Sequence, residues 1–170
     1  ALTIDGSGNL YVGGYFTTIG GQAKKNIVKL NITDGTLDLT FNPNANNYNV
    51  NTLVVDGSGN IYVGGDFTTI GGQARNYIAK LNTIDGSADA TFNPDASGYV
   101  KALALDDGGN IYAGGEFTSI GGQTRNRIAK LNTTDGSADL TFNPNASGRV
   151  ETLCLDGSGN LYAGGNFSSI

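Results

Sequence analysis

The sequence contains no histidine, no methionine and no tryptophan, and it has only one cysteine and three prolines. Without histidine, neither a Ser-His pair for nucleophilic catalysis nor a usual zinc site can form. The single cysteine, Cys154, excludes a disulfide framework within the chain and a cysteine-based metal cluster. Because Cys154 lies in an apolar stretch, we expect its thiol to be buried and inert. Much hydrolase and metalloenzyme chemistry is thereby excluded, and we predict that the chain is not an enzyme.

Long apolar runs and an excess of basic residues are also missing. No stretch approaches the roughly 20 apolar residues that a membrane span needs, and no charged-then-apolar signal segment opens the sequence. The 15 acidic residues outnumber the 10 basic ones, which gives a net charge of -5. Nucleic-acid binding depends on neutralising phosphates with Lys and Arg. We therefore expect no membrane insertion and no nucleic-acid partner.

The chain is rich in glycine, with 27 of 170 residues, and in one repeated pattern. Asp5, Asp56, Asp106 and Asp156 each begin D-G-S-G-N or its variant D-D-G-G-N, at spacings of 51, 50 and 50 residues. N-[LI]-Y-[VA]-G-G-x-F follows in every copy, and the first three copies continue through K-L-N to D-G-[ST]-x-D-x-T-F-N-P. The whole chain, 1–170, is thus a single repeat array with units 1–49, 50–99, 100–149 and a partial unit 150–170.

Each unit is predicted to contain four β-strands, because β-branched and aromatic residues cluster in short runs between Gly, Asn and Asp turn signals. In the second unit the expected strands are 50–55, 60–67, 76–82 and 88–93, with D-G-S-G-N as the first hairpin turn. The fold class is all-β. A β-propeller of four-stranded antiparallel blades, present as a partial ring, fits a repeat of about 50 residues, and a β-solenoid is the alternative.

The motifs VGGDFTTIGGQ, IAKLN and DGSADATFNP resemble the delta-60 repeats of bacterial β-propeller proteins, a domain of unknown function. The resemblance covers the whole chain, as about three and a half repeats. It implies a propeller from a large secreted or cell-surface protein and implies no activity. Both ends of the sequence fall inside a unit, so we expect further repeats or another copy of the chain to complete the ring.

Two acidic patterns suggest chemistry other than turn formation. D-G-S-G-N is similar to a calcium loop, but it lacks the Glu at position 12 of that motif, so calcium is an alternative to a plain hairpin turn. Asp34 with Asp38 is repeated as Asp85 with Asp89 and suggests the paired carboxylates of glycoside hydrolysis. Because equivalent pairs recur, turn capping is the favoured interpretation. No cofactor is expected.

The connections after the second and fourth strands leave on one face of an antiparallel blade, here called the long-loop face. In the second unit they are 68–75 and 94–99, and they vary most between copies, as binding loops do. With acidic turns opposite, we expect an electrically two-faced molecule. The candidate interaction residues on or beside the long-loop face are Lys24, Lys25, Tyr48, Arg75, Tyr77, Tyr99, Arg125, Arg127 and Arg149.

Repetition, the absence of histidine and the resemblance favour a non-catalytic extracellular or cell-surface scaffold or adhesion module. Its partner would be a protein or glycan at the long-loop face, or a second copy in a homo-oligomer or filament. The alternative is a lectin-like or polyanion-binding propeller with one weak site per blade. An enzyme with a site in the channel is a third hypothesis, and it requires polar residues unique to one blade, chiefly Asp107, Arg149 and Glu151.

Overall fold

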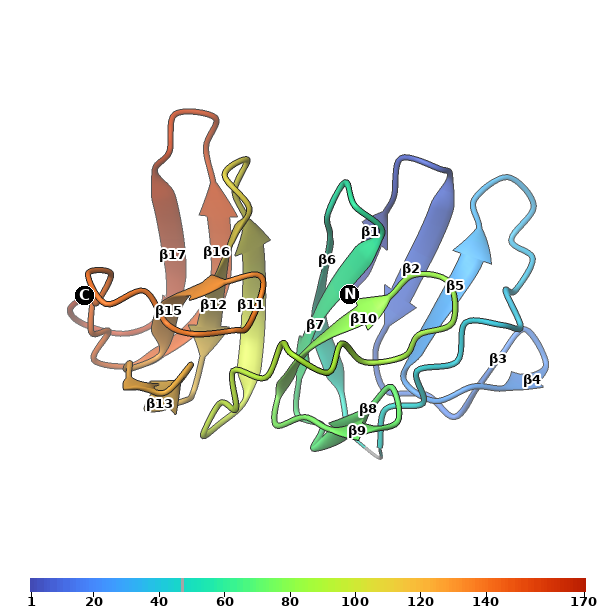
Figure 1. Ribbon diagram of the computed structural model, residues 1–170, viewed down its shortest axis with the longest axis horizontal. Helices are drawn as coiled ribbons and strands as arrows, with labels where there is room; N and C mark the ends of the chain where they lie inside the picture. Colours follow the sequence, from blue (N-terminus) through green and yellow to red (C-terminus); the bar gives the residue numbers. More distant parts are fainter. Residues whose placement is uncertain (47) are drawn as a thin grey trace.

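The computed structural model describes residues 1–46 and 48–170, and the regular elements in this part of the chain are all β-strands (Figure 1). The first unit holds β1 (Leu2–Ile4), β2 (Asn9–Gly13), β3 (Thr18–Ile19), β4 (Gln22–Ala23) and β5 (Ile27–Asn31). The second holds β6 (Val50–Val55), β7 (Asn60–Gly65), β8 (Thr69–Ile70), β9 (Gln73–Ala74) and β10 (Ile78–Asn82). The third holds β11 (Val100–Leu105), β12 (Asn110–Gly115), β13 (Ser119–Ile120), β14 (Gln123–Thr124) and β15 (Ile128–Asn132). The partial fourth unit holds β16 (Arg149–Leu155) and β17 (Leu161–Asn166).

Each complete unit forms one three-stranded antiparallel sheet, in the orders β1-β2-β5, β6-β7-β10 and β11-β12-β15. The D-G-S-G-N segments are the hairpin turns between the first two strands, as predicted. Part of the second connection, expected as loop, forms the small hairpins β3–β4, β8–β9 and β13–β14. The all-β class and the repeat of antiparallel sheets are therefore confirmed.

The predicted fourth strand, 88–93, does not form a ladder. Ala88 makes a single bridge with Leu81, and the chain then leaves the sheet. The cause is local: the Asp89 carboxylate accepts hydrogen bonds from the N–H groups of Thr91 (2.8 Å) and Phe92 (3.2 Å), which folds the backbone into a turn. The T-F-N-P segment that follows binds the next unit instead of its own sheet.

The hydrophobic core lies between the units. One cluster combines Tyr11 and Phe41 of the first unit with Leu53 and Ile61 of the second. A second cluster joins units two and three in the same way, and a smaller one joins the third unit to β16 and β17. A single unit has too little apolar surface to fold alone, so each is stabilised by its neighbours.

In the first three units, the first glycine of the G-G pair at the end of the second strand permits the close approach of the next sheet. A Cβ atom on Gly64 would lie 2.6 Å from Cγ1 of Val100, which begins the first strand of the third unit. That position therefore excludes any side chain. Phe67 and Phe117, which follow the pairs in units two and three, are fully buried, as expected.

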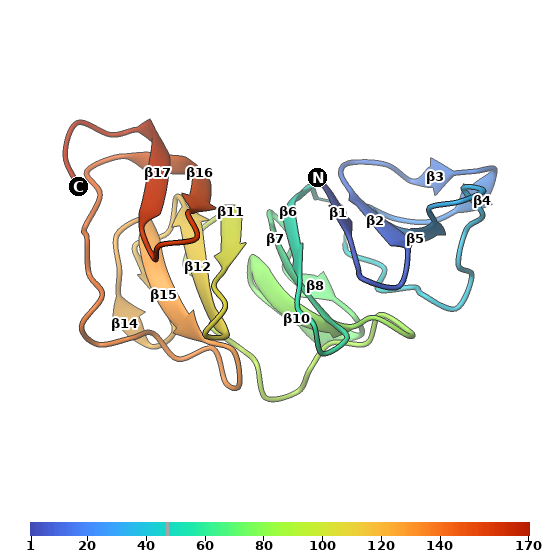
Figure 2. The same cartoon turned by 90° about the horizontal axis from the view of Figure 1, so that it is seen from above.

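The sheets stand side by side in an open arc, with the first and last units at opposite ends (Figures 1 and 2). Neighbouring first strands contact each other, β1 with β6, β6 with β11 and β11 with β16. Both end sheets expose apolar residues that are buried elsewhere: Leu2 is 68% exposed and its equivalent Leu53 is 6% exposed. The prediction of a buried Cys154 is wrong for the same reason, because no unit covers that face of β16. The described residues contain no helix long and apolar enough to cross a membrane.

Candidate functional site: the junction between units

Three of the predicted interaction residues are not available to a ligand. Lys24, Arg75 and Arg125 occupy equivalent positions and are buried, at the end of the small hairpins. Arg75 donates hydrogen bonds from its guanidinium to the carbonyl oxygens of Ala74 and Asp89, both at 2.7 Å. Arg125 makes the same pair of bonds, and Lys24 Nζ donates to the carbonyl oxygen of Phe41 at 2.9 Å. These cations fasten the segment after the third strand to the hairpin and do not belong to an interaction face.

The other basic residues of the long-loop face are partly neutralised. Arg149 pairs with Glu116 at 3.5 Å and with Glu151 beside it, and Arg127 donates to the carbonyl oxygen of Ala146 at 2.8 Å. Lys25 is exposed. Three of the basic residues predicted for this face are thus buried, and Arg127 and Arg149 are held by groups of the chain itself. The electrically two-faced molecule stays a prediction.

The tyrosines of this face form a small aromatic group. Tyr77 packs edge-on against Tyr99 with ring centroids 5.4 Å apart, and Lys101 Nζ lies 4.9 Å from the Tyr99 centroid. Lys101 also pairs with Asp66 of the preceding unit at 3.2 Å. Tyr48 and Tyr99 are exposed.

The aspartates of the first hairpin turns are fully engaged with their own loops. One carboxylate oxygen of Asp56 accepts N–H bonds from Ser58 (2.8 Å) and Asn60 (3.0 Å), and the other accepts from the Asn60 amide (2.8 Å) and the Tyr62 hydroxyl (3.5 Å). Burial opposes ionisation, but these bonds outweigh it and hold the pKa of Asp56 below its usual value. Calcium at these turns stays an untested alternative, and it would have to compete with these four donors for the carboxylate. No cluster of three or more acidic or thiol groups suited to a metal occurs in residues 1–46 and 48–170.

The paired aspartates cap turns. Asp34 accepts bonds from the N–H and hydroxyl of Thr36, and Asp38 accepts the same two bonds from Thr40. The repeated pairs Asp85–Asp89 and Asp135–Asp139 behave alike. These carboxylates are therefore held by local donors in each copy.

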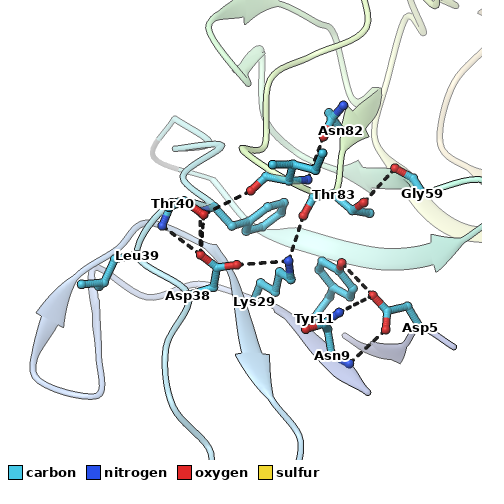
Figure 3. Close-up of polar contacts among 12 residues, drawn as sticks. Asp5, Asn9, Tyr11, Lys29, Asp38, Leu39, Thr40, Gly59, Asn82 and Thr83 are labelled. Carbon is cyan, nitrogen blue, oxygen red and sulfur yellow. Dashed lines mark hydrogen bonds and ion pairs between the residues drawn. The ribbon is translucent and has the colours of Figure 1, made fainter. Parts of the chain in front are cut away.

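Asp38 also begins a set of contacts that crosses to the second unit, here called the latch (Figure 3). Lys29 Nζ lies 3.1 Å from Asp38 Oδ2 and donates a hydrogen bond to the carbonyl oxygen of Thr83, also at 3.1 Å. The Thr40 hydroxyl shares its one proton between Asp38 Oδ1 at 2.6 Å and the carbonyl oxygen of Ile84 at 3.3 Å. The Asn42 N–H donates to the carbonyl oxygen of Asp85 at 3.0 Å. Three donors of one unit thus bind three consecutive carbonyls of the next.

The latch recurs at the second junction with the same chemistry. Lys80 donates to the carbonyl oxygen of Thr133 at 3.3 Å. The Thr91 hydroxyl shares its proton between Asp89 Oδ1 at 2.7 Å and the carbonyl oxygen of Thr134 at 3.1 Å. Sequence reasoning missed these lysines and threonines. The signal was present, since a lysine recurs in every otherwise apolar third strand and a threonine recurs two residues after the second aspartate of each turn.

The exposed fraction of the tyrosine in each second strand shows how completely the neighbouring unit covers that strand. Tyr11 and Tyr62 are fully buried, Tyr112 is partly buried, and Tyr162 is 61% exposed. Burial, together with the charge of Asp56, raises the pKa of Tyr62 to about 12, and burial raises the pKa values of Tyr11 and Tyr112 as well. Two junctions are closed, and the side of the last unit is open.

The family model described as "Domain of unknown function (DUF5122) beta-propeller" matches residues 6–41, 57–92 and 109–142, which together make up more than half of the chain. The chain belongs to the DUF5122 β-propeller family. Each match runs from the D-G-S-G-N turn or its variant to the phenylalanine of T-F-N-P, so the first match includes Lys29, Asp38 and Thr40 of the latch. This confirms the resemblance and the β-propeller, and it removes the β-solenoid alternative. No curated protein matches the chain.

The solved structures that resemble this DUF5122 chain include a propeller domain and extracellular domains. The WD40 β-propeller domain of Doa1 aligns with a TM-score of 0.63 and 14% identity, over 94% of this chain and 45% of that one. The extracellular domains of the hybrid two-component proteins BT4673 and BT3049 of B. thetaiotaomicron align with TM-scores of 0.61 and 0.56 and identities of 16% and 14%. They cover 98% and 96% of this chain, and 20% and 25% of those chains. The chain thus spans less than half the length of these structures, and the similarity shows the fold.

Proposed function

We propose that this DUF5122 chain is a non-catalytic repeat scaffold or adhesion module that acts outside the cell. The observation that carries the proposal is the use of the recurring polar side chains. The turn aspartates accept bonds from their own loops, the buried cations bind backbone carbonyls, and the latch lysines join units. The polar side chains that recur in each copy thus stabilise the fold. This use suits a protein that acts by presenting a binding surface.

The extracellular location is supported by two of the structural neighbours, whose descriptions are extracellular domains of B. thetaiotaomicron signalling proteins. We propose the same side of the membrane for this chain. Labelling of intact source cells with an antibody against the chain tests it. Signal that appears only after the cells are permeabilised would contradict it.

A screen for turnover tests the absence of catalysis. Chromogenic esters, phosphates and glycosides are incubated with the full chain, and the expected rate equals that of buffer. An enzyme on a repeat scaffold requires residues unique to one unit, and Asp107 and Glu151 are such residues. Turnover that is lost in Asp107→Asn or Glu151→Gln, with the fold retained, would overturn the proposal. Capture of a glycan or protein on arrays without turnover would support it.

A lectin-like function is the second candidate, and one observation favours it. Tyr99 is an exposed ring beside Lys101 and Tyr77, an arrangement of an apolar face next to polar groups. A glycan array with the chain and its Tyr99→Ala variant tests this function. The control is Tyr162→Ala, which removes a more exposed ring at the second position of β17. Equal glycan signals for both variants would exclude the tyrosine site.

A further inference from the structure

Tyr77 holds a backbone conformation that a tyrosine rarely adopts. Its φ is +66°, in the left-handed region, and the equivalent residues of the other complete units, Asn26 and Arg127, have φ values of +63° and +65°. Asparagine tolerates this region because its short side chain bonds locally, whereas a bulky side chain there is strained. The repeat thus fixes an unfavourable backbone at this position, and the second unit fills it with a tyrosine.

In the other two units the side chain at this position stabilises the loop before the next first strand. Asn26 donates a hydrogen bond to the carbonyl oxygen of Asn46 at 3.1 Å and also accepts one from a backbone N–H. Arg127 donates to the carbonyl oxygen of Ala146 at 2.8 Å. Among residues 1–46 and 48–170, the Tyr77 side chain makes no bond of this kind. Stability therefore explains Asn26 and Arg127 and leaves the tyrosine without a structural reason.

The Tyr77 ring is used at the second junction instead. It packs edge-on against Tyr99, directly before β11, with an angle of 79° between the rings. Tyr77 is half-buried, while Tyr99 is 42% exposed. An edge-on contact restricts the orientation of the exposed ring. The strained residue therefore holds an aromatic side chain in place at the surface.

Polar groups surround this exposed ring and are themselves held in position. Lys101 Nζ lies 4.9 Å from the Tyr99 centroid and 3.2 Å from Asp66 Oδ1. The Asn51 amide donates a 2.7 Å hydrogen bond to the same oxygen of Asp66. The Lys101 and Asp66 side chains both remain partly exposed. A hydrogen-bond donor and an acceptor of opposite charge thus lie beside an aromatic ring, already ordered by contacts within the chain.

We propose that Tyr99, Lys101 and Asp66 bind one pyranose ring of a neutral oligosaccharide, with Tyr77 as the residue that positions Tyr99. An aromatic ring covers the apolar C–H face of a pyranose, while an ammonium donates to one hydroxyl and a carboxylate accepts from its neighbour. An acidic glycan gains little from a lysine that Asp66 already neutralises. This site rests on the lectin-like candidate function, to which it adds the class of ligand and the use of Tyr77.

Tyr77→Asn separates binding from stability, because it places in the second unit the residue type of the first. An asparagine there relieves the backbone strain and can bond to the loop as Asn26 does, so the melting temperature should rise. Binding to an array of neutral gluco-, manno- and galacto-oligosaccharides should fall about tenfold, as it does when a central aromatic contact is lost.

Two further variants of the full chain serve as controls. Tyr77→Phe keeps the edge-on ring and should retain the array signal. Arg127→Asn changes the equivalent left-handed position of the third unit and should leave the signal unchanged. Equal signals for Tyr77→Asn and the unaltered chain, with the signal lost in Tyr99→Ala, would refute the positioning by Tyr77 and leave the lectin-like function standing.

The remaining outcomes test the ligand and the strain. Signal confined to sulfated or sialylated glycans and removed by salt would overturn the neutral ligand. Signal on a peptide array with none on glycans would assign the surface to proteins and overturn the site together with the lectin-like function. A melting temperature lowered by Tyr77→Asn would show that the tyrosine serves the fold. The scaffold function stands in each of these cases.

Discussion

Lys29 in the first unit donates a 3.1 Å hydrogen bond to the carbonyl oxygen of Thr83 in the second unit, while its ammonium group pairs with Asp38 of its own unit. The acceptor is a backbone carbonyl, so the bond to the second unit does not require any particular side chain at position 83. Its recurrence as Lys80 and Thr133 explains how units of different sequence stack in one geometry.

Lys29→Met should destabilise the chain more than Lys130→Met. The first substitution removes a charge-assisted bond to a carbonyl, and we expect a loss of about 1–2 kcal/mol in the free energy of unfolding. The second removes a 3.9 Å pair of partly exposed groups, and its effect should stay under about 1 kcal/mol. Urea unfolding of both variants measures the difference. Equal losses would mean that the inter-unit bond contributes nothing.

Gly86→Ala should cost more than Gly35→Ala, its equivalent in the first unit. Both glycines have positive φ, +82° and +71°, so each substitution carries a backbone cost of roughly 1–2 kcal/mol. A Cβ atom on Gly86 also meets Pro43, whereas none of the described atoms outside the adjacent residues lies within 4 Å of one on Gly35. The overpacking adds about 1–3 kcal/mol. The difference in melting temperature between the two variants measures the cost of overpacking. Equal melting temperatures would argue against a tightly packed junction at Gly86.

Acid should weaken the latch. Burial opposes ionisation of Asp38, but bonds from Thr40, Lys29 and nearby N–H groups outweigh it and lower the pKa to about 2. An unfolded aspartate titrates near 3.9, so this stabilisation is complete above about pH 4 and is lost as the pH falls toward 2. Asp38→Asn should flatten the decline in melting temperature over that range, and Asp107→Asn should not. A decline of the same slope in both variants would count against the assignment.

Alkali should act through the buried tyrosines. Burial and the nearby charge of Asp56 raise the pKa of Tyr62 to about 12, above the ordinary value near 10. The neutral phenol therefore stabilises the fold fully below about pH 10, and this contribution disappears as the pH rises through 12. Tyr62→Phe should reduce the loss of stability between these limits, as followed by circular dichroism. Tyr162→Phe is the exposed control, and an effect as large as that of Tyr62→Phe would contradict the burial argument.

The period of the repeat predicted the all-β class and the hairpin turns, because D-G-S-G-N carries its own hydrogen-bonding partners. It did not predict that residues 88–93 leave the sheet. The alternation of apolar and polar residues that indicates a strand is the same whether the segment pairs with its own sheet or contacts the next unit. The choice is made by the Asp89 turn and by acceptors on the third unit, such as the carbonyl of Asp135, some 40 residues away along the chain.

The burial of Lys24, Arg75 and Arg125 was not predicted, for a related reason. The position that holds Lys24 in the first unit holds Arg75 and Arg125 in the next two. A cationic residue in a loop at an equivalent position of each repeat is a pattern typical of a binding surface. Burial and two carbonyl acceptors per guanidinium are properties of the packed unit and are not visible in the sequence. The opposite error concerns the lysines of the third strands. A lysine in an alternating strand normally points to solvent, so their contacts with the next unit were not predicted.

Amide hydrogen exchange of the full chain at low concentration tests most directly whether the units form an open arc in which each is stabilised by its neighbours. We predict the slowest exchange in β7, whose unit is covered on both sides, and faster exchange in β1 and β17 at the ends. Protection of β17 equal to that of β7 would show that the last sheet is covered in solution, and would contradict the account.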